Sequence, residues 1–174
     1  MPNTYKSIKD PGRNNRMGGL QQRVFLAVFS EFQTLQKPAA GTYKITEAHV
    51  FAAGKGFIEL YVTKDTGSLK FTPLGGPDRK SFLAEGEFLH PGESDDIEKF
   101  ANESKNDRFI LLAPLPGSTE LYQIGNEEFQ VEIDSEYDTG KNSGDGRGSL
   151  FRFRCFCANK IKYTAATIPM ATDA

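Results

Sequence analysis

Most apolar positions in this chain follow patterns that are typical of β-strands. Residues 23–32 form an apolar run without helical spacing, which predicts a strand buried on both faces. From residue 42 to residue 89, short alternating runs are separated by turns about every 8–12 residues, a spacing typical of a sandwich or a barrel. Gly86 lies inside one of these runs and indicates a bulge or a close approach of other backbone.

The second half of the chain contains further strand patterns. In 128–134, apolar and polar residues alternate cleanly, so Phe129, Val131 and Ile133 are expected to face the core. The polar segment that follows contains several glycines and is expected to be a loop. The other expected strands in this half are 108–113, 120–124 and 149–158.

One helix is predicted at about 95–105. Ile97, Phe100, Ala101 and Ser104 have the i, i+3, i+4, i+7 spacing of a narrow apolar stripe. Asp95 with Glu98 three residues later fits a capping box in which Asp replaces Ser or Thr. We therefore expect a mostly β fold, a single β-sandwich or barrel, with one short helix lying across a sheet.

The 174 residues fit one domain with an arm at one end and a tail at the other. Residues 1–19 are polar and rich in Pro and Gly, which predicts a flexible N-terminal arm. Residues 20–163 would form the β-sandwich domain, and residues 164–174 a C-terminal tail.

Composition and charge remove several classes of function. The 21 basic and 23 acidic residues give a net charge of −2, without the basic excess of a nonspecific nucleic-acid-binding surface. No apolar run reaches the length of a membrane span, and the first ten residues lack the apolar region of a secretory signal. The two cysteines are one residue apart and cannot join distant parts of the chain, which indicates a reducing compartment.

No group of residues has the spacing of a catalytic, cofactor or metal site. His49 and His90 have no evident partners for a catalytic triad. The Gly-rich segment 139–148 has its Lys directly after the first Gly and joins two strands, unlike a phosphate-binding loop. Cys155 and Cys157 have no nearby His, so burial is expected rather than zinc binding. We expect a protein that is not an enzyme and has no cofactor.

Two charged patterns near the C-terminus have more than one interpretation. Asp134, Glu136 and Asp138 alternate before Gly140, but the glycine is one place late for an EF-hand, and cation binding by this cluster stays open. Arg152 and Arg154 lie on the strand face opposite Phe151 and Phe153. These arginines would either pair with acidic residues of a neighbouring strand or subunit, or remain solvated.

Several segments together resemble the bacteriophage tail tube proteins, over about residues 20–160. They are Asn106-Asp107-Arg108-Phe109-Ile110-Leu111-Leu112, Tyr122-Gln123-Ile124-Gly125, Phe129-Gln130-Val131-Glu132-Ile133-Asp134, Thr139-Gly140 and Gly144-Asp145-Gly146-Arg147-Gly148-Ser149-Leu150-Phe151-Arg152-Phe153. In that family, a β-sandwich with a flanking helix forms rings of six copies. The rings stack into a tube through which DNA passes.

The resemblance implies a structural protein of the virion tail, present in the host cytoplasm before assembly. Its partners would be copies of itself, other tail proteins and phage DNA that passes without specific binding, with no membrane. Residues facing the lumen would be Glu128, Gln130, Glu132 and Asp134. An inter-subunit loop would contain Gly140, Lys141, Gly144, Asp145, Gly146, Arg147 and Gly148, and Arg152 and Arg154 would pair between subunits.

Two other classes share these features. A connector, tail-terminator or decoration protein would have the same β-rich composition. A small-ligand-binding β-barrel would need a closed apolar interior.

Overall fold

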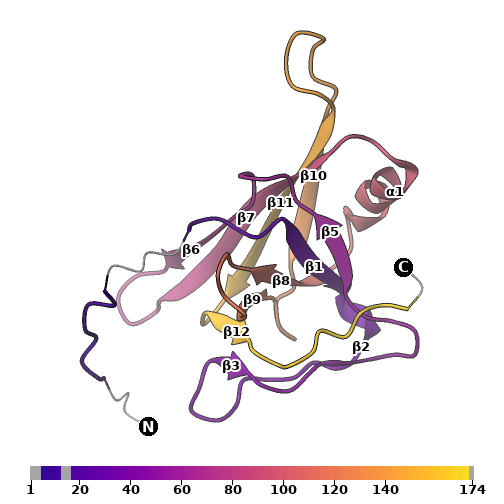
Figure 1. Ribbon diagram of the computed structural model, residues 1–174. Helices are drawn as coiled ribbons and strands as arrows, with labels where there is room; N and C mark the ends of the chain where they lie inside the picture. Colours follow the sequence, from indigo (N-terminus) through magenta and orange to yellow (C-terminus); the bar gives the residue numbers. More distant parts are fainter. Residues whose placement is uncertain (1–4, 13–16, 173–174) are drawn as a thin grey trace.

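The computed structural model describes residues 5–12 and 17–172, and it is mostly β with one α-helix in those ranges (Figure 1). Residues 1–4 and 13–16 of the expected arm, and 173–174 of the expected tail, lie outside the described residues. Residues 5–12 are exposed and belong to no helix or strand. No helix in the described part of the chain is both long and apolar enough to cross a membrane.

Two neighbouring inner strands are the most buried part of a six-stranded sheet. β1 (Arg23–Val28) pairs antiparallel with β8 (Phe109–Pro114), and every residue of β8 is buried. Four residues of β1 are also buried, which confirms the prediction of a strand covered on both faces. The full order is β3 (Lys44–Ile45), β12 (Ile161–Tyr163), β9 (Leu121–Ile124), β8, β1 and β5 (Ile58–Tyr61).

A second sheet has four antiparallel strands and contains the longest strands of the fold. β7 (Ser81–Pro91) and β11 (Gly148–Cys157) lie at its centre and have 11 and 10 residues. Their outer neighbours are β6 (Ser68–Leu74) and β10 (Glu132–Asp138). Phe88 of β7 stacks on Phe151 of β11, with ring centroids 5.3 Å apart, on the face turned toward the six-stranded sheet.

Two hydrophobic cores lie on the two faces of the six-stranded sheet. The main core lies between the sheets and combines buried residues of β1, β7, β8, β9 and β11. The second core covers the other face with Phe25, Ala27, Ile110 and Leu112. Residues 29–57, which we call the flap, pack over this second core. The flap contains the 3-10 turn η1 (Phe29–Glu31), β3, and a two-stranded ribbon of β2 (Phe32–Thr34) and β4 (Val50–Phe51).

The described part of the expected tail is bound along the flap. The Thr164 amide donates to the carbonyl of Ile45 at 2.8 Å, and the Phe57 amide donates to the carbonyl of Pro169 at 2.8 Å. The Ala171 amide then donates back to Phe57 at 3.0 Å. Residues 164–172 therefore help to close the second core.

The expected helix is present as α1 (Asp95–Ser104), but its cap is one residue earlier than expected. The extended Ser94 is the N-cap, and its hydroxyl accepts the Ile97 amide at 3.4 Å, so Asp95 is the first helical residue. Ile97 is buried, and Phe100 packs against Phe109 and Phe151. The apolar stripe thus faces the main core, as expected.

The first of the alternating runs expected after residue 42 forms two short strands. β3 lies parallel to β12 in the large sheet, whereas β4 pairs with β2. The chain leaves one sheet and joins another between them. Ile45 and His49 are both buried.

Candidate functional site

The outer face of the four-stranded sheet carries oppositely charged residues in rows across the strands. In one row, Arg154 of β11 lies between Glu132 of β10 and Glu85 of β7, with Lys70 of β6 next to Glu85. Residues directly opposite each other in antiparallel strands share a face, so these four side chains form one row. A second row contains Asp134, Arg152, Glu87 and Ser68.

Arg152 is the most closely paired cation of this face. It lies 2.9 Å from a Glu136 carboxylate oxygen and 3.5 Å from one of Glu87. The hydrogen bond with Glu136 raises the pKa of Arg152 above its usual value. Both partners belong to neighbouring strands of the same sheet, one of the two pairings expected for Arg152.

The expected strand 128–134 begins later than its alternation indicates. Asn126 forms a turn in which its side-chain oxygen accepts the amides of Glu128 and Phe129, each at 2.8 Å. Gln130 donates to two carbonyls of the same turn. Of the four expected lumen-facing residues, Glu132 and Asp134 lie on the outer face of the sheet, and Glu128 and Gln130 lie in the turn before it.

The segment 135–148, expected to be a loop, is one over most of its length, but its two ends belong to the β10–β11 hairpin. β10 pairs with β11 as far as Asp138 opposite Gly148, which leaves 139–147 as the connecting loop. Figure 1 shows this hairpin extending beyond the body of the molecule. Gly140 adopts φ 68°, and a Cβ there would lie 2.0 Å from the carbonyl oxygen of Asp145, so the loop requires glycine at this position.

The base of the hairpin is fixed to the segment before α1. The Tyr137 hydroxyl donates to a carboxylate oxygen of Glu93, and Arg147 lies 3.4 Å from the same oxygen. The Gly92 amide donates to the carbonyl of Arg147 at 2.8 Å. Hydrogen bonding to Glu93 raises the pKa of Tyr137, so this hydroxyl stays protonated. The loop therefore projects from a braced base.

β10 also presents an open backbone edge. Val131, just before β10, exchanges both backbone hydrogen bonds with Phe109 of β8, at 2.8 and 3.1 Å. The backbone N–H and C=O groups of successive residues point to opposite sides of a strand. The N–H and C=O of Ser135 and Tyr137 therefore point to the same side as those of Val131, away from β11. In the described part of the chain, neither residue has a backbone partner on that side. Both are exposed.

Two shallow depressions lie on the charged face. One, of about 400 Å³, lies over the charged rows and is bordered by Lys70, Glu87, Asp134, Arg152 and Arg154. The other, of about 360 Å³, lies at the end remote from the hairpin loop. It is bordered by Arg108 and by the exposed rings of Phe129 and Phe156, whose centroids are 6.2 Å apart.

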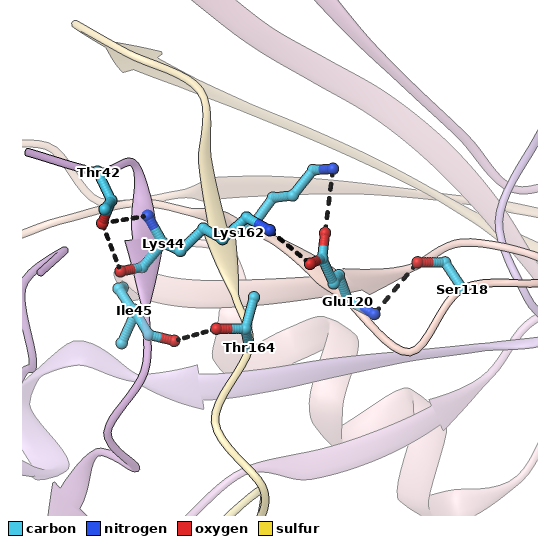
Figure 2. A network of polar contacts seen from close by, with 7 residues as sticks. All are labelled: Thr42, Lys44, Ile45, Ser118, Glu120, Lys162 and Thr164. Carbon is cyan, nitrogen blue, oxygen red and sulfur yellow. Dashed lines mark hydrogen bonds and ion pairs between the residues drawn. The ribbon is translucent and has the colours of Figure 1, made fainter. Parts of the chain in front are cut away.

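A separate polar cluster joins three segments at the edge of the six-stranded sheet (Figure 2). Glu120 accepts hydrogen bonds from Lys44 of β3 at 2.7 Å and from Lys162 of β12 at 3.2 Å. The hydrogen bond from Lys44, followed by that from Lys162, lowers the pKa of Glu120. A carboxylate held ionised between two lysines is unsuited to general acid catalysis, and the cluster is an ion-pair network that links β3 and β12.

The cysteines are poor nucleophiles. Burial raises the pKa of Cys155 to about 12 and also raises the pKa of Cys157, so both remain thiols at neutral pH. Within the described residues, no three His, Cys, Asp or Glu side chains lie close enough together to hold a metal ion. The chemistry of the face is thus that of fixed charges and open backbone groups.

The comparisons with known proteins give no relatives. No protein-family model matches the chain, and no curated protein and no solved structure matches it.

Proposed function

We propose that this chain is a structural subunit that assembles with copies of itself into stacked rings, as the tail tube proteins of bacteriophages do. In the tail tube family each ring has six copies. The stacked rings would form the conduit for DNA in a virion tail. The observation that carries the proposal is the open edge of β10 on a projecting, braced hairpin.

An exposed edge strand is a template for pairing with another chain, because its N–H and C=O groups lack partners. The opposite edge of the same sheet is β6. Pairing β10 of one copy with the β6 side of the next is a head-to-tail contact, and such contacts generate rings when the rotation closes. The sheets of neighbouring copies would then be continuous.

The charged face supports a conduit for a polyanion. Acidic side chains outnumber basic ones on this face. The acidic ones are Glu85, Glu87, Glu132, Asp134 and Glu136, and the basic ones are Lys70, Arg108, Arg152 and Arg154. A lumen lined by this face would repel phosphates at short range, so DNA would slide through it without binding. The internal pairing of Arg152 keeps its charge from attracting phosphates.

Replacing Ser135 with proline tests the role of the edge. Proline removes the amide that points away from β11, and it is tolerated on edge strands when that amide is not used in the ladder. We expect a folded protein that sediments as a monomer under conditions in which the unmodified chain assembles. Analytical ultracentrifugation measures the assembly, and thermal unfolding checks the fold.

Ser135→Ala is the matched control, because it removes the hydroxyl and keeps the backbone amide. This variant is expected to assemble like the unmodified chain. If Ser135→Pro and Ser135→Ala assemble equally well, the β10 edge is not the subunit contact.

A further inference from the structure

The β6 edge of the four-stranded sheet carries one basic side chain on the charged face. β6 is the outermost strand opposite β10, and within the described part of the chain its residues make no backbone hydrogen bond beyond the ladder with β7. Lys70 is exposed and lies opposite Glu85, but it makes no ion pair with any described carboxylate. Its charge is therefore available to a partner beyond this edge.

The β10 edge is acidic on the same face. The acidic residues that alternate along this strand are all exposed, and they are Glu132, Asp134, Glu136 and Asp138. The first lies 3.5 Å from Arg108, the third lies 2.9 Å from Arg152, and the fourth accepts the Gly140 amide. Asp134 makes no ion pair within residues 5–12 and 17–172. Each edge thus has one unpaired ion, and the two ions have opposite charges.

We propose that Lys70 of one copy pairs with Asp134 of the next copy, and that this ion pair directs the β10 edge to the β6 edge. The inference rests on the proposed ring and names the side chains that select its contact. All pairs in the four-stranded sheet are antiparallel, so β6 runs antiparallel to β10. Copies related by rotation in a ring would therefore continue the sheet with one more antiparallel pair.

The rows across the sheet bring the two charges within reach of each other. When the rows continue straight into the next copy, Lys70 lies opposite Glu132 and diagonal to Asp134. When the register shifts by two residues toward the hairpin loop, Lys70 lies opposite Asp134 itself. Opposite side chains of an antiparallel pair are about 5 Å apart and diagonal ones about 7–8 Å, a distance that a lysine spans. The ion pair therefore fits both registers.

The same charges disfavour the wrong contact. Two β10 edges could pair with each other and close a dimer, because an isologous contact uses the same surface twice. That pairing would set the acidic row of one copy against the acidic row of the other, and like charges directly opposite destabilise a strand pair. Contact with the edge that carries Lys70 lacks this repulsion. The charges thus select the head-to-tail contact that a ring requires.

Reversing the charge at each edge tests the ion pair. Lys70→Glu would set two carboxylates against each other at the contact, and Asp134→Lys would set two ammonium groups against each other. We expect each variant alone to need about tenfold more protein to assemble than the unmodified chain, measured by analytical ultracentrifugation. In a one-to-one mixture, contacts between unlike copies join opposite charges again. The mixture should assemble as readily as the unmodified chain, with the two variants alternating.

Two further variants control for net charge and for folding. Lys55→Glu makes the same change of charge in the flap, away from both edges of the four-stranded sheet, and it should assemble like the unmodified chain. Lys70→Gln removes the cation without placing a new carboxylate opposite Glu85 of its own chain, and its assembly should lie between that of Lys70→Glu and that of the unmodified chain. Thermal unfolding checks that each variant is folded.

The outcomes separate this inference from the proposed function. If Lys70→Glu assembles at the concentration that suffices for the unmodified chain, the ion pair is wrong and the ring proposal stands. A mixture that assembles no better than its two components would also overturn the ion pair. If the unmodified chain itself does not assemble, the ring and the ion pair fail together.

Discussion

Replacing Val131 with aspartate is expected to cause the largest loss of stability of any single change in β10 or in the residues just before it. Val131 has no exposed surface, and it bridges β8 and β10 through its two hydrogen bonds with Phe109. A carboxylate at this position would be buried in the main core without a cation to pair with. We expect the free energy of unfolding to fall by about 4 kcal/mol, in the range of the most destabilising substitutions. Urea unfolding measures the loss.

Glu132→Gln is the matched control for that substitution. Glu132 is the next residue and points to the opposite face, where its side chain is 50% exposed and lies 3.5 Å from Arg108. Removing one exposed charge should change the free energy of unfolding by less than about 1 kcal/mol. Similar losses for the two variants would contradict the assignment of the two faces.

Replacing Gly86 with alanine is expected to separate two strands of the four-stranded sheet. A Cβ at Gly86 would lie 2.1 Å from the carbonyl oxygen of Ser68 in β6 and 2.6 Å from Cζ of Phe153 in β11. The backbone oxygen cannot move without disturbing the β6–β7 ladder. Overpacking of this kind should cost about 3 kcal/mol, measured by thermal or urea unfolding.

Gly146→Ala is the control, because no atom lies within 4 Å of the added Cβ in the hairpin loop. Its stability should match that of the unmodified chain. If Gly86→Ala were tolerated as well as Gly146→Ala, β6 would not lie as close to β7 as the structure places it.

The parts of the fold that could be predicted are those with a strong local pattern. The apolar run of β1, the stripe of α1 and the inward positions Val131 and Ile133 are all confirmed. Gly86 was expected to mark a bulge or a close approach, and the structure shows the close approach. Each of these signals comes from the residues of one segment.

The errors arise where a local alternative competes with the pattern. Phe129 continues the alternation of Val131 and Ile133, but its side chain is 49% exposed. Its backbone amide donates to the Asn126 side chain, so Phe129 belongs to the turn before the strand. Ser94 takes the cap from Asp95 because its extended backbone lets the hydroxyl reach Ile97. Both errors move an element boundary and leave the element itself in place.

The candidate site was harder to predict, because its signals are weak or non-local. Residues after 134 were expected to be a loop, because Ser135 and Tyr137 offer no apolar face, yet residues 135–138 belong to β10, where both side chains are exposed. The partners of Arg152 lie on two other strands. The sequence of one strand does not show which residues of another strand will lie opposite it.

Electron microscopy of the purified, unmodified chain tests the central claim of self-assembly most directly. Images at high protein concentration are predicted to contain rings or tubes with an open central channel, built through the β10 edges. A uniform population of single chains, both in these images and in sedimentation, would contradict the proposal that this protein is a tube subunit.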